Sequence, residues 1–200
     1  MQGTVAVYLV INRISQFIMT IDLKKWTHLP TDNDFIQIET YIGTSLPLDY
    51  KSCMRIYNNI APRVEAIYCY DIKWEDGKAT FVRQGIIEEW LPIYSGTITI
   101  DHGEGNPAST LPTLLDALNN YRDKDFPRVP INTIPIGDAG DGDKILMGIG
   151  EQNNGIIYYW VMNFEEEYDE PGISPSYDNI GFIASSFTEF LKSLYHCEEE

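Results

Sequence analysis

Residues 134–160 restrict the possible folds of this chain more than any other stretch. A short apolar run at 134–137 precedes a loop of alternating aspartate and glycine, and two further apolar segments follow. Asn154-Gly155 lies between those two segments, and Asn-Gly is a strong hairpin-turn pair. Glycine permits positive φ, and aspartate bonds readily to nearby backbone N–H groups. The stretch therefore predicts strand, acidic loop, strand, turn and strand, with Pro135, Gly137 and Gly142 as structural residues.

Helix signals lie on both sides of this stretch. A helix is expected at 32–42, because Thr31 or Asp32 can cap its start and Gly43 can end it. Pro47 suits the first turn of a second helix. Further elements are expected as strands at 63–70, 79–84 and 90–100, a helix at 112–122, and a last helix capped by Ser186 with Glu189.

Helices at both chain ends around a run of strands predict a single α+β domain. We expect a mainly antiparallel, twisted sheet of about five or six strands packed with helices from both ends, with one face or edge open near the acidic loop. Residues 26–200 form this domain, and residues 1–25 are an N-terminal extension. The extension has both helical spacing and a β-branched start, so helix, strand and a true translation start at Met19 all stay open.

The negative charge is concentrated in the last third of the chain. The net charge is −16, and residues 138–200 carry 14 acidic but only two basic residues, a net of −12. Nucleic acid is excluded as a direct partner because phosphate binding needs clustered lysine and arginine. An acidic field attracts basic proteins. The negative charge by itself is also explained more simply, because an acidic surface keeps a protein soluble.

Motifs for metal, cofactor or catalysis are missing from the sequence. Asp138, Asp141 and Asp143 resemble a calcium loop, but neither register supplies the glutamate that an EF-hand needs at position 12. The loop has no lysine-serine pair and no following helix, so it does not suit phosphate. Asp101, His102 and Glu104 lack visible partners and are expected to be a solvated loop. No cofactor is predicted, and no segment suits a membrane span.

Cysteine usage points to a reducing compartment. The chain has three cysteines, an odd number, without CxxC or zinc spacing. Cys53 and Cys69 are expected to be core thiols. A cytoplasmic location is the prediction that follows.

Three short motifs together resemble the SUKH superfamily, named for a yeast cell-wall-synthesis regulator and a set of bacterial immunity proteins. The first is Leu46-Pro47-Leu48-Asp49-Tyr50-Lys51, and the second is the central stretch with its Pro135, Gly137 and Gly142-Asp143. The third is the closing helix at 183–191, read as A-x-S-F-x-E-F-L. The resemblance covers residues 35–194. One departure is at 58–62, where the family often has Asn-Gly-Gly and then proline.

The resemblance implies a binding protein without catalysis. Bacterial members are largely immunity proteins that neutralise a cognate toxin, and a basic nuclease toxin would suit an acidic inhibitor. Trp160 can be either a core residue or an interface anchor. A regulatory or scaffold module with a host protein partner and an unrecognised enzyme are the alternatives. The hypothesis places the partner-binding face at Asp138, Asp141, Asp143, Trp160, Glu165, Glu166, Glu167, Tyr168, Asp169 and Glu170.

Overall fold

The structure is a computed structural model, and it describes part of the chain. The predicted extension at 1–25, the strand residues 63–67 and the acidic run at 165–170 lie outside the described residues. The described residues are 29–58, 68–76, 79–96, 98–100, 109–123, 127–162 and 179–196.

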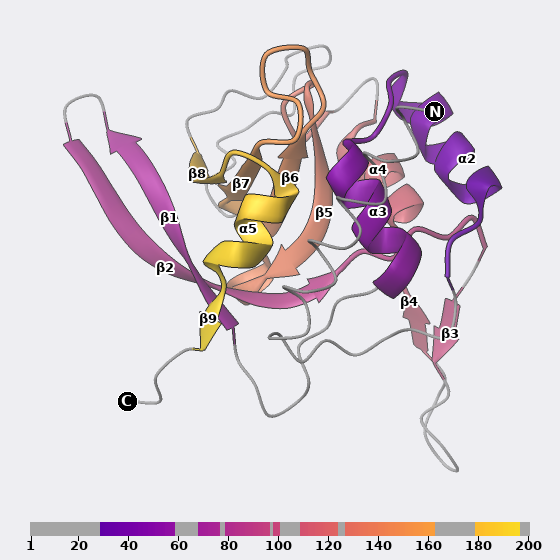
Figure 1. Cartoon of the computed structure of the whole chain (residues 1–200), viewed down its shortest axis with the longest axis horizontal. Coiled ribbons are helices and arrows are strands. Elements are labelled where there is room, and N and C mark those ends of the chain that lie inside the picture. The colour runs from indigo at the N-terminus through magenta and orange to yellow at the C-terminus, as the bar shows by residue number, and fades with distance from the viewer. Residues whose placement is uncertain are drawn as a thin grey trace, which may run out of the picture.

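The central element is a closed antiparallel sheet (Figure 1). The seven strands of this sheet have the order β2-β5-β6-β7-β8-β1-β9. Because β1 also pairs with β2, the first six strands close into a barrel, and the short β9 lies beside β1. The strands are β1 (Tyr68–Asp76), β2 (Ala79–Trp90), β5 (Thr133–Ala139), β6 (Lys144–Gly148), β7 (Ile157–Trp160), β8 (Ile180–Ala184) and β9 (Tyr195–His196), while β3 (Ile98–Ile100) and β4 (Ser109–Leu111) pair separately.

Strands β1 and β2 form a long hairpin that projects from the barrel (Figure 1). Their register runs from Cys69 opposite Ile86 to Asp76 opposite Ala79. By contrast, β1 meets β8 at a single pair, Lys73 and Phe182. The barrel therefore closes at Lys73, and the paired residues 74–76 and 79–81 extend beyond it towards the turn.

The first and the last of the described helices begin with the caps that the sequence predicts. The described helices are α2 (Asp32–Ile42), α3 (Leu48–Tyr57), α4 (Leu114–Tyr121) and α5 (Phe187–Ser193). Thr31 and Asp34 form a capping box at α2, and Gly43 ends it with a φ of 75°. Pro47 occupies the N-cap of α3. The Ser186 hydroxyl accepts from the Glu189 N–H at the start of α5.

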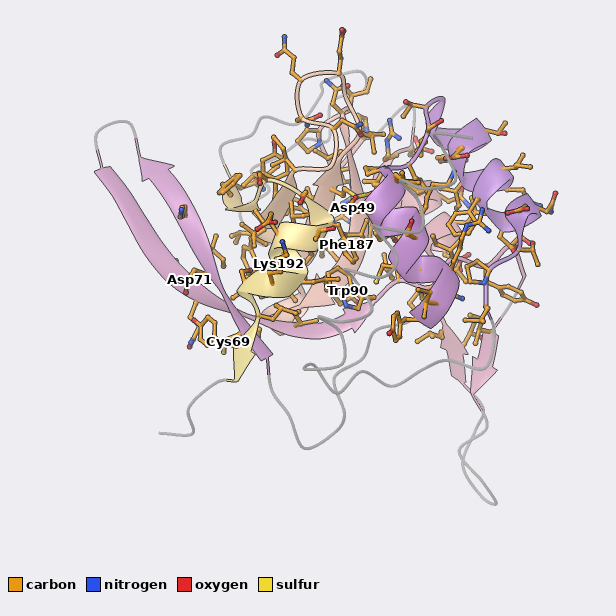
Figure 2. The ribbon with its side chains drawn as sticks, viewed as in Figure 1. Asp49, Cys69, Asp71, Trp90, Phe187 and Lys192 are labelled. Atoms are coloured by element: carbon orange, nitrogen blue, oxygen red, sulfur yellow. The ribbon has the colours of Figure 1, made fainter. Side chains whose placement is uncertain are left out.

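Helix α5 buries its apolar face in the main core. Phe187 and Phe190 both make edge-on contacts with Trp90, at ring-centroid distances of 5.3 and 5.4 Å. Tyr50 of α3 meets Phe187 at 5.0 Å, and Figure 2 shows Asp49 and Phe187 close together above Trp90. Edge-on aromatic pairs add about 0.5–1.5 kcal/mol beyond burial. This cluster joins α3 and α5 to the barrel.

The predicted fold class is confirmed, with corrections in detail. The structure is an α+β domain whose antiparallel sheet is packed with helices from both ends. Of the open face or edge expected near the acidic loop, the edge is wrong, because among the described strands β5 pairs with β2 and β6 pairs with β7. The strand expected at 90–100 is confirmed only at its two ends, because Trp90 belongs to β2 and Ile98–Ile100 form β3, while residues 91–96 are not strand. Strand β2 ends at Trp90, and the Ile93 N–H donates to Asn58 Oδ1 at 2.9 Å instead of to a neighbouring strand.

The two described cysteines differ. Cys53 is a buried free thiol, as predicted, and burial followed by the nearby Asp49 raises the pKa of this thiol. Cys69 is disulfide-bonded, so the prediction of a core thiol is wrong there. Cys197 is the one other cysteine of the sequence and lies outside the described residues.

Candidate partner-binding site

The acidic loop is a tight connection between two paired strands. It consists of the short 3-10 helix η1 (Gly140–Gly142) and Asp143, between β5 and β6. The Ala139 N–H donates to the Asp143 carbonyl at 3.0 Å, which closes the loop. Gly142 has a φ of 85°, a left-handed conformation that strongly favours glycine. The loop is therefore set by its backbone, with Asp141 at its middle.

Asp143 is a structural residue of this loop. Its side chain is 7% exposed. One carboxylate oxygen accepts from the Tyr159 hydroxyl at 2.5 Å, and the other accepts from the Met162 N–H at 2.9 Å. These bonds tie the loop to the end of β7. A carboxylate engaged in this way holds the site in shape and has little surface to offer a partner.

Asp138 is paired inside the same site. Its carboxylate lies 3.0 Å from Lys144 Nζ, and these two residues are cross-strand partners. Lys144 also donates to the Gly142 carbonyl at 3.1 Å and lies 5.9 Å from the centre of the Tyr121 ring. Lys144 is one of only two basic residues in the acidic last third. Its charge is therefore used within the loop, to balance Asp138.

Trp160 lies beneath this site, in a small second core. It is fully buried, with Val129 and Leu146, and its ring meets Tyr121 edge-on at 5.7 Å. Its indole therefore packs beneath the acidic loop and presents no surface to a partner. Alternation along β7 places Trp160 on the outer side of the barrel, but the segment after α4 covers it.

The described residues on either side of the acidic run lie close together. Residues 163–178 connect β7 to β8 and lie outside the described residues. The Val161 N–H donates to the Asn179 carbonyl at 3.1 Å, and Asn179 Nδ2 donates back to the Val161 carbonyl at 3.1 Å. Both ends of the connection are thus held together beside the Met162 N–H that Asp143 binds. The acidic loop and the residues that flank the undescribed segment, Met162 and Asn179, therefore lie at one end of the barrel, which we call the acidic end.

A partly exposed apolar surface, which was not predicted from the sequence, lies along β7 and β8. Tyr158, Ile180 and Met162 are half-buried and pack against the Trp160 cluster. Phe182 is opposite Tyr158 on β8, and Lys73 Nζ lies 6.0 Å from the centre of its ring. Alternation at 156–160 indicates which side chains of β7 share one face of the sheet. Strand β8 was not predicted from the sequence, so its pairing with β7 could not be predicted either.

The described residues show neither a metal-binding cluster nor a membrane-spanning helix. Within those segments, no group of three or more histidine, cysteine, aspartate or glutamate side chains is arranged to hold a metal ion. Across the same residues, each helix is too short or too polar to span a bilayer.

Comparison with known proteins agrees with the three sequence motifs. The SMI1 / KNR4 family (SUKH-1) matches residues 29–193, which is most of the chain. The chain is also 28% identical over 182 residues to the SPbeta prophage-derived uncharacterized protein YokK of Bacillus subtilis (strain 168), covering 88% of this chain and 80% of that protein. No solved structure matches. Because the family match spans the domain and the three motifs meet in one core, the chain belongs to the SMI1 / KNR4 (SUKH-1) family.

Proposed function

We propose that this protein is a non-catalytic immunity protein that binds and neutralises a basic protein toxin. Membership of the SUKH-1 family supports this proposal, because that family is widely associated with immunity to polymorphic toxins. The observation that carries it further is that the acidic loop is bonded to Met162, next to the paired residues Val161 and Asn179. Between Met162 and Asn179 the sequence carries Glu165, Glu166, Glu167, Asp169 and Glu170.

Along the sequence, residues 138–178 carry much more negative than positive charge. Lys144 is the one basic residue between 138 and 178, and it pairs with Asp138. The segment 163–178 contains six acidic residues and no lysine or arginine. A field of one sign raises association rates with an oppositely charged partner by about ten- to a thousandfold. A basic nuclease, whose active site binds phosphate, is the kind of toxin that this surface suits.

The predicted contact residues have different roles in this proposal. Asp138, Asp143 and Trp160 fix the loop and the end of β7. Asp141 and the acidic aromatic run, including Tyr168, contact the toxin. Fixing the base of a binding surface reduces the entropy lost on association.

The cytoplasmic location stays a prediction. The disulfide bond of Cys69 counts against it, because disulfides are rare in reducing compartments.

A growth assay tests the proposed function. Cells expressing the basic toxin domain encoded beside this chain's gene should stop growing, and co-expression of this chain should restore growth. An unrelated protein of similar net charge serves as the control, since it shows whether negative charge alone protects. Continued arrest despite soluble expression of this chain would refute the immunity function.

A further inference from the structure

A pocket of about 630 Å³ lies at the opposite end of the central strands from the acidic end. Strand β5 runs from the pocket end at Thr133 to the acidic loop, a length of roughly 20 Å at 3.3 Å per residue. In Figure 1 the connection between β6 and β7 stands out above the barrel. The pocket is lined by Asn132, Glu151, Gln152, Asn153, Ile156 and Tyr158.

The wall of this pocket is a tightly held turn. Asn153 Oδ1 accepts from the Gly150 N–H at 2.8 Å, and Asn153 Nδ2 donates to the Asn132 carbonyl at 3.2 Å. The Ile149 N–H donates to that same carbonyl at 2.8 Å. A Cβ added to Gly148 would lie 2.0 Å from the Asn153 carbonyl oxygen. The turn is therefore fixed in one shape before any ligand arrives.

Three polar side chains of this pocket are not used in holding that shape. Within the part of the chain that the structure describes, the side chains of Asn132, Glu151 and Gln152 make no hydrogen bond or ion pair. A hairpin needs only two turn residues to reverse direction, yet residues 149–156 connect β6 to β7 here. The longer turn presents two amides and one carboxylate beside Tyr158.

The chemistry of these groups selects the ligand. None of the six lining residues carries a positive charge, and Glu151 carries a negative one, so an anion is disfavoured. Each free amide offers both a donor and an acceptor, which complements a peptide backbone. Ile156 and Tyr158 offer apolar surface to a long side chain, and a tyrosine ring attracts a cation.

We propose that this pocket binds a lysine or arginine side chain on an exposed segment of a partner protein. The cationic group pairs with Glu151, its aliphatic stem lies on Ile156 and Tyr158, and Asn132 and Gln152 bind the flanking peptide groups. This is a second contact, separate from the acidic end. This inference rests on the proposed function in one respect, because it takes a basic protein as the partner.

A backbone-amide NMR titration with N-acetyl-arginine amide tests the pocket directly. The expected shifts are confined to residue 132 and residues 149–158. N-acetyl-norleucine amide, which has a comparable stem without the charge, should bind at least fivefold more weakly. E151Q should weaken the arginine probe at least fivefold, because it removes the one carboxylate of the pocket. E189Q, on the exposed side of α5, should leave the affinity unchanged.

The outcomes separate this inference from the proposed function. Absence of shifts at residues 149–158, equal binding of the uncharged probe, or unchanged affinity in E151Q would overturn the pocket assignment. Shifts found only around residues 138–144 would also overturn it, while leaving the acidic end as a binding surface. Failure of the growth assay would remove the immunity role without bearing on these shifts.

Discussion

At the scale of single residues, the acidic loop shows that a carboxylate in a predicted site can serve the fold. Asp143 is bound by Tyr159 and Met162, and Asp138 is paired with Lys144. Short acidic residues beside glycine are typical both of turns and of charged surfaces. The sequence alone could not separate these roles, because the bonding partners of Asp143 lie 16 and 19 residues further along the chain.

The two loop glycines provide a matched pair of substitutions. Gly142 has a φ of 85° with open space around it, so Gly142→Ala should cost about 1–2 kcal/mol of unfolding free energy through backbone strain alone. Gly140 also faces open space but has no positive φ, so Gly140→Ala should be neutral or slightly stabilising. Urea unfolding of both variants measures the difference. Equal effects would show that Gly142 is not held in its left-handed conformation.

At the scale of elements, the first and third recognised motifs form a contact between helices α3 and α5. Asp49, in the Leu46–Lys51 motif, accepts from the Thr188 N–H at 2.9 Å and the Thr188 hydroxyl at 3.1 Å. The carboxylate thus satisfies an N-terminal donor of α5, close to the positive end of the helix dipole. Capping signals at Thr31, Gly43 and Ser186 were readable from sequence because they are local. The bond between Asp49 and Thr188 was not, because 139 residues separate them.

Asp34 should make the attachment of α2 depend on pH. Burial raises the pKa of this carboxyl, but hydrogen bonds from Ser95 and Thr31 outweigh it and leave the pKa below 3.8. A lowered pKa means that the stabilisation is present above the unfolded value, near 3.9, and is lost as the pH falls through the folded value. Asp34→Asn should therefore cost about 1–2 kcal/mol at pH 7, in the range of a lost helix cap.

Unfolding of the wild type and Asp34→Asn across pH 7 to 3 measures this effect. The difference between them should shrink below about pH 4. Asp32→Asn is the control, because Asp32 forms an ion pair with Arg55 while its side chain is 77% exposed, and such pairs contribute little. A difference between wild type and Asp34→Asn that stays constant across the range would show that the Asp34 charge does not stabilise α2.

At the scale of the whole molecule, the sequence predicted the class of fold but not the closure of the sheet. Strand, loop and turn signals in residues 134–160 led to three correctly ordered strands, β5, β6 and β7. Closure depends on β1 meeting both β2 and β8, and no local pattern reports a pairing such as Lys73 with Phe182. Direct pairing of β7 with β8 holds together Val161 and Asn179, the described residues on either side of the acidic segment, near the Asp138–Asp143 loop.

The most direct measurement is affinity capture from lysate of the protein's own cells with three baits in parallel. One bait is the wild type, the second carries Glu166→Gln and Glu167→Gln, and the third carries Asp32→Asn and Glu189→Gln, which changes the charge equally but elsewhere. The baits are washed at low salt and again at roughly 0.5 M, where the Debye length is about 4 Å. The difference in retained partner measures the electrostatic contribution to binding.

The account predicts a stoichiometric basic protein that the wild type and the third bait retain at low salt. This partner should be loosened by salt, and the second bait should retain much less of it, because the acidic end attracts it. Equal retention by the second and third baits, or no specific partner at either salt, would contradict the central claim that the acidic end binds a basic protein.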